Sequence, residues 1–180
     1  LKINDLLATH FPQINKGLFE LMDRVEVFMV NTHPALGFIR PLVPTTIQLG
    51  FMHIEPPKEL SDRDLKTIVE KSTNGVIYLS FGSNIASRDL DKELIDILLQ
   101  VIRKNSKYGF VWKFENEKFE NMPSNLLTSK WLPQADLLAH KNVKLFISQC
   151  GQQSIEEAID RLVPIICIPF LGDQPGIAKK

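Results

Sequence analysis

The sequence is poor in cysteine and histidine, the residues that most often build metal sites and disulfide frameworks. Cys150 and Cys167 are the two cysteines among 180 residues, and two cysteines do not make a disulfide framework. The four histidines are scattered along the chain, at His10, His33, His53 and His140. No Cys/His spacing resembles that of a metal site. We therefore expect no metal, and we expect each histidine to be a surface or capping residue.

The sequence also has no excess of charge of one sign and no long apolar run. Its 21 basic and 21 acidic residues cancel, which argues against a nucleic-acid surface or a polyanionic partner. The most apolar segment, Leu162 to Leu171, is short and contains two prolines, whereas a membrane span needs about 18 apolar residues. With 44% hydrophobic residues, the chain nevertheless has enough apolar material for a core.

Both ends of the sequence look cut rather than natural. The chain starts at Leu1 without a methionine or a signal-peptide pattern. It stops at Lys180, within what reads as the first turns of a helix. We therefore expect the sequence to be a fragment of a longer protein.

The first part of the chain is predicted to be mostly extended connection. A helix is expected over Leu18 to Met22, a strand over Val25 to Val30 and a short strand over Thr46 to Leu49. Prolines recur between the two strands, and each removes a backbone donor and fixes φ. Pro56-Pro57 is the best candidate for an interdomain linker, so we predict one domain over 1–55 and another over 56–180.

Beyond this boundary, apolar strands alternate with helices. Strands are expected at 76–80, 110–114, 143–148 and 164–169, and helices at 62–71, 91–104, 135–140 and 154–161. The apolar residues of 91–104 recur at helical spacing, which is typical of an amphipathic helix. Strands that are apolar almost throughout, joined by helices and short connections, argue for a parallel sheet covered on both faces. We therefore predict a Rossmann-like α/β fold.

Two of the predicted helices begin with a capping pattern. Ser61 can cap the helix of 62–71, with Asp64 at the third helical position, and Ser154 is followed by Glu157 three residues on. Ser154 can also help to present the free amides of its helix start, which carry about half a positive charge and favour a bound phosphate. The local pattern supports the cap and the phosphate site equally.

A turn with polar residues, Phe81-Gly82-Ser83-Asn84, follows the strand of 76–80. Gly82 lacks a Cβ, so the backbone can approach a ligand there, and the hydroxyl of Ser83 can donate to a phosphate or a base. The dinucleotide-binding pattern GxGxxG is absent. Taken alone, an ordinary strand-to-loop turn is the better interpretation.

Polar residues also follow the last two predicted strands, where an α/β sheet binds ligands. Gln149 and Gln153 can face one point together with Ser154 and the helix-start amides. Asp173-Gln174 offers a carboxylate beside an amide, which suits paired sugar hydroxyls. The simpler interpretation is that Asp173 caps the last helix.

Trp131 and Gln134 lie in a loop-like context beside Pro133. An indole there can stack on a base, with Gln134 bonding a sugar hydroxyl. A tryptophan usually belongs to the core, however, and that interpretation is preferred for Trp131 unless other observations intervene.

Taken in order, these motifs resemble one known family. Val30 to His33 with Arg40-Pro41 resembles its segment before the interdomain linker, and Tyr78 to Ser83 resembles the start of its donor-binding domain. Phe146 to Gln174 covers most of the family signature, with these residues in register: Gly151, Ser154, Glu157, Val163, Pro164, Pro169, Asp173 and Gln174. The chain resembles the central piece of a UDP-glycosyltransferase of the UDP-glucuronosyltransferase type. The resemblance implies the two-domain GT-B fold, here an incomplete C-terminal donor domain with the tail of the N-terminal acceptor domain.

The resemblance implies that nine residues bind a UDP-sugar. Trp131 would stack on uracil, with Gln134 near the base and ribose, and Glu157 would accept from the ribose hydroxyls. Asp173 and Gln174 would bind hydroxyls of the transferred sugar. Four residues would surround the diphosphate: Ser83, Gln149, Gln153 and Ser154.

The sequence departs from the family pattern at four positions. Gln149 stands where the family usually has histidine, and it can donate a hydrogen bond but cannot become cationic. Because glutamine here is typical of arthropod-type and related viral members, the resemblance implies UDP-glucose rather than UDP-glucuronic acid. Cys150 and Leu162 stand where glycine is common, and Ile177 stands where an asparagine is expected near the phosphates.

The resemblance also implies an inverting displacement that needs no metal and no cofactor. A base removes the proton of an acceptor hydroxyl, the oxygen attacks the anomeric carbon, and UDP leaves. This chain would stabilise the charge that develops on the diphosphate. The catalytic His and its Asp partner, and a pocket for a small lipophilic alcohol or phenol, would lie before Leu1. The parent would be a detoxification enzyme of the endoplasmic reticulum membrane, facing the lumen, with its membrane span after Lys180.

Three interpretations of the chain follow. In the favoured one it is the donor-binding fragment of a UDP-glucosyltransferase, inactive as a separate polypeptide. In the second it is a truncated or pseudogene product that binds nucleotide weakly or not at all. In the third it belongs to another GT-B glycosyltransferase with a different sugar donor.

Overall fold

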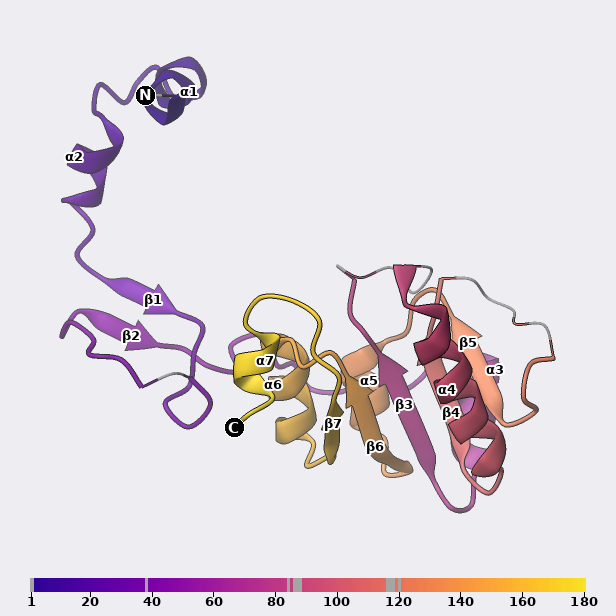
Figure 1. Ribbon diagram of the computed structural model, residues 1–180. Coiled ribbons are helices and arrows are strands. Elements are labelled where there is room, and N and C mark those ends of the chain that lie inside the picture. Colours follow the sequence, from indigo (N-terminus) through magenta and orange to yellow (C-terminus); the bar gives the residue numbers. More distant parts are fainter. Residues whose placement is uncertain (1, 38, 84, 86–88, 116–118, 120) are drawn as a thin grey trace. The chain divides into compact units, whose positions relative to one another are not determined.

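The chain forms two compact units, Leu1–Gly50 and Phe51–Lys180 (Figure 1). The computed structural model describes residues 2–37, 39–83, 85, 89–115, 119 and 121–180. Asn84 of the predicted polar turn therefore lies outside the described residues. The division falls shortly before the predicted boundary after residue 55, and the acceptor and donor roles of the two parts stay predictions.

The first unit consists of two helices and a pair of short strands. These elements are α1 (Lys2–His10), α2 (Leu18–Met22), β1 (Phe28–Val30) and β2 (Thr46–Gln48). The two strands are parallel, with Phe28 opposite Thr46. None of the residues described in this unit is buried. The sequence predicted α2 and both strands, although β1 is shorter than expected, and it did not predict α1.

The second unit contains a five-stranded parallel sheet with the strand order β5-β4-β3-β6-β7 (Figure 1). Its strands are β3 (Val76–Ser80), β4 (Gly109–Lys113), β5 (Leu126–Ser129), β6 (Val143–Ser148) and β7 (Ile165–Cys167). Its helices are α3 (Arg63–Lys71), α4 (Lys92–Lys104), α5 (Gln134–Leu138), α6 (Gln152–Asp160) and α7 (Gln174–Ile177). The predicted α/β class with a parallel sheet and flanking helices is confirmed. Strand β5 was not predicted.

Successive residues of the central strands face two separate cores. Tyr78, Val111 and Phe146 pack with α3, α5 and α6, and the rings of Tyr78 and Phe146 stack with their centroids 4.9 Å apart. Leu79 and Trp112 pack with α4 in the second core. Because neighbouring side chains of a strand point to opposite faces, a sheet covered on both sides requires strands that are apolar throughout. The central strands are apolar almost throughout, with Lys144 of β6 an exposed exception.

The N-cap of α3 is Asp62. The predicted cap, Ser61, is therefore wrong by one residue. Oδ1 of Asp62 accepts a hydrogen bond from the backbone N–H of Leu65 at 2.7 Å. Asp64 is therefore the second helical residue and not the third. A carboxylate accepts such a bond more strongly than a hydroxyl, and the helix N-terminus favours a negative charge.

Helix α6 begins earlier than predicted, at Gln152, with Gly151 as its N-cap. Ser154 is the third residue of the helix, so the predicted capping box with Glu157 is wrong. The hydroxyl of Ser154 instead accepts a hydrogen bond from Nε2 of Gln134 at 3.0 Å.

Cys150 and Cys167 form a disulfide across a sequence separation of 17 residues. Two cysteines did not indicate a disulfide framework, and this bond was not predicted. The reason is topological: β6 and β7 are neighbouring parallel strands, and Ser148 pairs with Cys167 at their ends. The residues that follow β6 therefore lie beside the end of β7.

Within the described part of the chain, no helix combines the length and the apolar character that crossing a bilayer requires.

Candidate functional site

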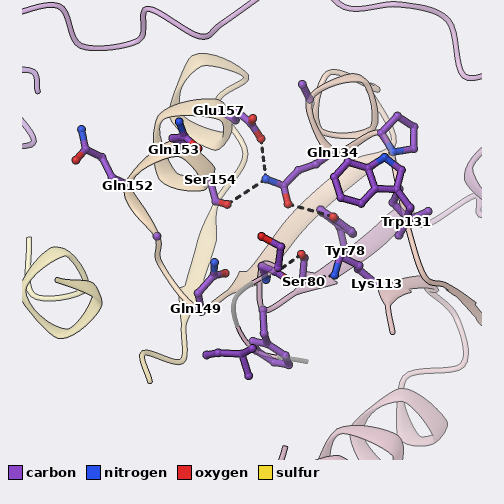
Figure 2. Close-up of a pocket in the computed structure, with 18 of the residues that line it drawn as sticks. Tyr78, Ser80, Lys113, Trp131, Gln134, Gln149, Gln152, Gln153, Ser154 and Glu157 are labelled. Carbon is purple, nitrogen blue, oxygen red and sulfur yellow. Dashed lines mark hydrogen bonds between the residues drawn. The ribbon is translucent and has the colours of Figure 1, made fainter. Parts of the chain in front are cut away.

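A cavity of about 580 Å³ lies at the carboxyl ends of the strands of the second unit (Figure 2). The chain builds one side of the sheet from β3 to β5 and then returns to β6, on the other side of β3. The segments that follow β3 and β6 therefore diverge, and this is the crevice in which open α/β sheets bind ligands. All nine residues predicted to bind a donor line the cavity: Ser83, Trp131, Gln134, Gln149, Gln153, Ser154, Glu157, Asp173 and Gln174. Their contacts with a ligand stay predictions.

Gln134 is the centre of a hydrogen-bond network in one wall of the cavity (Figure 2). Its Nε2 donates to Oγ of Ser154 at 3.0 Å and to Oε2 of Glu157 at 2.7 Å. Its Oε1 accepts from the hydroxyl of Tyr78 at 3.1 Å. Burial raises the pKa of Tyr78 far above its ordinary value, so its hydroxyl keeps the proton that it donates. The side-chain amide is thus fixed in one orientation, because the carboxylate can only accept.

Trp131 is not a core residue, contrary to the interpretation that its residue type favours. It is 75% exposed, whereas Trp112 is fully buried. Its carbonyl oxygen accepts a hydrogen bond from the hydroxyl of Ser129 at 2.8 Å, directly after β5. An exposed indole in the wall of a polar cavity offers a flat apolar face to a planar ring.

The loops that follow β3 and β6 meet at Gly82 and Gln149. The hydroxyl of Ser148 donates to Oε1 of Gln149 at 3.1 Å, and Nε2 of Gln149 lies against Gly82. A Cβ at Gly82 would overlap this nitrogen, and the φ of Gly82 is 79°. The left-handed conformation therefore favours glycine here, and a larger residue would displace the side-chain amide of Gln149. Gln149 brings an amide donor to the region in which the diphosphate is predicted.

Lys113, at the end of β4, lines the cavity and was not singled out by the sequence analysis. Its Nζ donates to the carbonyl oxygen of Gly82 at 2.9 Å and pairs with Oε1 of Glu115 at 2.9 Å. Among the described lining residues it is the one cationic side chain. The signal that could have found it is its position, since it ends a strand at the same edge of the sheet as Ser80 and Ser148.

Asp173 and Gln174 line the cavity from the start of α7. Oε1 of Gln174 accepts from the backbone N–H groups of Phe170 and Leu171 at 2.8 and 2.9 Å, so the amide nitrogen is the group that can reach a ligand. Asp173 occupies the N-cap position, yet within the described chain its side chain makes no capping hydrogen bond. Ile177, at the end of α7, is not among the described residues that line the cavity.

The two positions at which the family commonly has glycine have a left-handed backbone. The φ of Cys150 is 64° and that of Leu162 is 57°. Leu162 follows α6, where its N–H bonds the carbonyl of Ile159 at 3.0 Å and the N–H of Val163 bonds that of Ala158 at 2.9 Å. This is a Schellman motif, in which glycine is preferred because other residues lose about 1–2 kcal/mol in the left-handed conformation.

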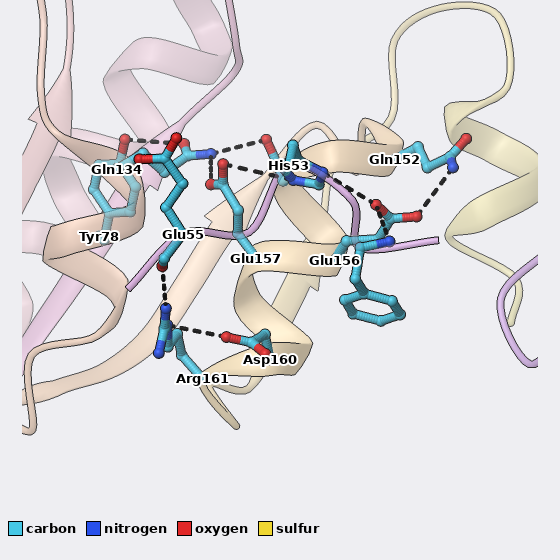
Figure 3. A network of polar contacts seen from close by, with 11 residues as sticks. His53, Glu55, Tyr78, Gln134, Gln152, Glu156, Glu157, Asp160 and Arg161 are labelled. Carbon is cyan, nitrogen blue, oxygen red and sulfur yellow. Dashed lines mark hydrogen bonds and ion pairs between the residues drawn. The ribbon is translucent and has the colours of Figure 1, made fainter. Parts of the chain in front are cut away.

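Behind the cavity, two adjacent carboxylates of α6 face His53 (Figure 3). Nδ1 of His53 lies 3.5 Å from Oε2 of Glu156, and its Nε2 lies 3.9 Å from Oε1 of Glu157. The expectation of a surface or capping role is therefore wrong for His53. It holds for the other three histidines: His33 and His140 accept from nearby backbone N–H groups, and His10 is exposed.

No group of three or more metal-ligating side chains comes together in the part of the chain that the structure describes. The chemistry of the cavity is that of hydrogen-bond donors and acceptors, one exposed indole and one lysine.

Known proteins are similar to this chain in sequence and in fold. The family model described as UDP-glucoronosyl and UDP-glucosyl transferase matches residues 2–180. An ecdysteroid UDP-glucosyltransferase of Mamestra brassicae nuclear polyhedrosis virus is 37% identical over 172 residues, which are 95% of this chain and 32% of the viral protein. UDP-glycosyltransferase UGT5 of Dactylopius coccus is 36% identical over 179 residues, which are 95% of this chain and 34% of that protein. The chain thus spans about a third of the length of these relatives.

A solved structure is also similar to this chain. Os79 from O. sativa, in complex with UDP, is 26% identical with a TM-score of 0.56, over 66% of this chain and 27% of that one. The match of the family model over nearly the whole chain confirms the resemblance drawn from the motifs. The chain belongs to the family of UDP-glucuronosyl and UDP-glucosyl transferases.

Proposed function

We propose that this chain carries the donor-binding half of a UDP-glycosyltransferase and that its second unit binds the UDP part of UDP-glucose. One observation carries the proposal: the residues implied by the family signature, spread from Ser83 to Gln174, line a single cavity at the switch point of the sheet. The names of the relatives support a glucosyl donor, and the UDP bound to Os79 supports a uridine nucleotide.

The nucleoside is proposed to bind between Trp131 and Glu157. The exposed indole stacks on uracil, a contact that contributes about 1–3 kcal/mol for a base on an aromatic ring. Glu157 is acceptor-only, and Gln134 occupies its Oε2, so its other oxygen is available to the ribose hydroxyls. Gln134 orients this carboxylate and does not compete for the same lone pairs.

The diphosphate is proposed to bind at the start of α6. The free amides of a helix N-terminus favour an anion, and Ser83, Gln149 and Gln153 add polar groups around them. Ser154 accepts from Gln134, so its own proton is directed elsewhere and can serve a phosphate oxygen. Lys113 supplies positive charge, a role that the neutral amide of Gln149 cannot perform.

The reaction proposed for the whole protein is an inverting transfer that uses neither a metal nor a cofactor. The hydroxyl oxygen of a small lipophilic acceptor bonds to the anomeric carbon, the bond from that carbon to the diphosphate oxygen breaks, and UDP leaves. The proton of the acceptor goes to a base outside this chain. The groups around the diphosphate stabilise the charge that develops on UDP, while Asp173 and Gln174 hold the sugar.

The parent protein is proposed to act in the lumen of the endoplasmic reticulum. The Cys150–Cys167 disulfide supports this location, because disulfides form and persist in oxidising compartments.

Calorimetric titration of UDP and of UDP-glucose into the purified chain tests the proposal. We expect heat of binding, a rise in melting temperature and quenching of tryptophan fluorescence as uracil covers Trp131. Trp131→Ala weakens binding about 5- to 150-fold, whereas the control Phe19→Ala, which removes a similarly exposed ring from the first unit, leaves it unchanged. If neither ligand gives heat or a thermal shift, the proposal is wrong. The chain is then a truncated or pseudogene product that does not bind nucleotide.

A further inference from the structure

We propose that His53 is a positioning residue of the donor site, which holds the carboxylate of Glu157 in the orientation that accepts from the ribose of UDP. The inference rests on the proposed function, because it concerns how one residue of that site is kept in place. His53 does not line the cavity, so a role in touching the donor is not proposed for it.

His53 is inserted between the two carboxylates of α6 (Figure 3). Its side chain is 22% exposed, that of Glu157 is 17% exposed, and that of Glu156 is 1% exposed. Among the described contacts neither ring nitrogen completes a hydrogen bond, although each faces a carboxylate oxygen at 3.5 or 3.9 Å. A small rotation of the Glu157 side chain or of the ring brings Nε2 of His53 and Oε1 of Glu157 into hydrogen-bonding distance.

The two carboxylates do not depend equally on His53. Glu156 accepts from Nε2 of Gln152 at 3.0 Å and from the backbone N–H of Phe51 at 3.4 Å, so both of its oxygens have an amide donor. Glu157 has Gln134 on Oε2 alone, and the described group that faces its Oε1 is His53. A buried carboxylate requires partners. Without the ring, the free oxygen of Glu157 is therefore the less constrained of the two.

The backbone around His53 is fixed on both sides. Phe51 donates to Glu156, and the carbonyl of Glu55 accepts from Nη2 of Arg161 at 2.9 Å, so residues 51–55 lie along α6. The imidazole is thus placed by two contacts that do not involve the ring. A ring held in this way restricts Glu157 from the side opposite to Gln134, and the ribose meets a carboxylate that is already oriented.

The test compares UDP with 2′,3′-dideoxyuridine diphosphate, which lacks both ribose hydroxyls, in the 180-residue chain. For the wild type we expect UDP to bind at least about tenfold more tightly, since hydrogen bonds to a charged group are lost. His53→Ala lowers the affinity for UDP about tenfold and changes that for the dideoxy ligand by less than about twofold, so the ratio of the two dissociation constants falls. Glu157→Gln, which removes the charge itself, lowers the same ratio.

Two further variants separate the two carboxylates. The amide nitrogen of His53→Gln reaches about as far as Nε2 and restores the preference for UDP, whereas that of His53→Asn reaches about as far as Nδ1 and does not. The melting temperature of each ligand-free variant is measured in parallel, and His53→Gln decides the question if His53→Ala does not fold.

The inference is overturned if His53→Ala weakens both ligands by the same factor, or if asparagine rather than glutamine restores the preference. Either result assigns His53 to Glu156 and to the stability of the fold. If the wild type binds neither ligand, the proposed function itself fails and this inference fails with it. If the wild type prefers UDP and every His53 variant keeps that preference, this inference alone fails.

Discussion

The side-chain amide of Gln134 donates to the carboxylate of Glu157 at 2.7 Å, although 23 positions separate the two residues in the sequence. The bond joins α5 to α6 at the edge of the cavity, and the same amide accepts from the buried hydroxyl of Tyr78. Gln134, on α5, thus connects Tyr78 of β3 to Glu157 of α6. Stability and ligand binding therefore respond together when Gln134 is changed.

Gln134→Met keeps the shape of this side chain and removes its polar groups. We expect a loss of about 1–3 kcal/mol in the free energy of unfolding, because the buried hydroxyl of Tyr78 loses the oxygen of Gln134 that accepts its proton. Urea denaturation measures the change. Tyr78→Phe in the same background should recover most of the loss, since it removes this hydroxyl. Strictly additive losses in the double variant would contradict this account.

Leu162→Gly is expected to stabilise the chain by about 1 kcal/mol. The residue has a φ of 57° in the turn that ends α6, and its side chain is 89% exposed, so the strain is relieved and little packing is lost. Denaturant unfolding of the wild type and the variant measures the gain. The matched control is Leu162→Ala, which keeps a Cβ and the strain. An equal gain in both variants would show that the apolar side chain, and not the backbone, is the cause.

Reduction of the Cys150–Cys167 disulfide is expected to lower the free energy of unfolding by about 2–4 kcal/mol, the usual effect of opening a loop of this length. Unfolding is followed with and without dithiothreitol. A double variant, Cys150→Ala with Cys167→Ala, should unfold at the same denaturant concentration in both conditions. Stability of the wild type that does not respond to the reductant would refute the expectation.

Gly82→Ala is expected to abolish UDP binding. Its Cβ overlaps Nε2 of Gln149, so the amide is displaced from the position in which we propose that it faces the diphosphate. Gly172→Ala is the control, because Gly172 has a φ of 60° but nothing within 4 Å of an added Cβ. Both variants should lose about 1–2 kcal/mol of stability through backbone strain, and only the first should lose its affinity for UDP in calorimetry. Equal effects on binding would mean that strain alone explains the loss.

Much of the second unit could be predicted from the sequence because its central strands are apolar almost throughout. The bounds of β3 and β6 were predicted correctly, since both apolar segments end at a serine that is followed by polar residues. Strand β5 was missed because Leu126–Ser129 is only partly buried and contains two polar residues. The cap at Asp62 and the early start of α6 show that a helix boundary depends on which neighbour competes for a polar group.

In the candidate site, too, some residues could be predicted from the sequence and others could not. The residues that line the cavity follow the strands in the sequence, and a family signature orders them, so they were predicted together. Trp131 would have been assigned to the core on residue type alone. His53 was missed because its partners lie more than a hundred positions away on α6, and no periodic pattern connects such positions. Lys113 was missed because a lysine at the end of a strand resembles any solvated charge.

The disulfide also limits how far two loops of the candidate site can move relative to each other. Cys150 lies just before the start of α6, where we propose that the diphosphate binds, and Cys167 ends β7, whose following loop leads to Asp173. The covalent bond ties the bases of these two loops, so relative drift between them is restricted. Transfer of a sugar depends on how the anomeric carbon is placed relative to the attacking acceptor oxygen, and a misplacement of about 1 Å is costly. At position 150, where the family commonly has glycine, this chain has a cross-linked cysteine, and the bond would keep the spacing between the proposed diphosphate and sugar sites nearly constant.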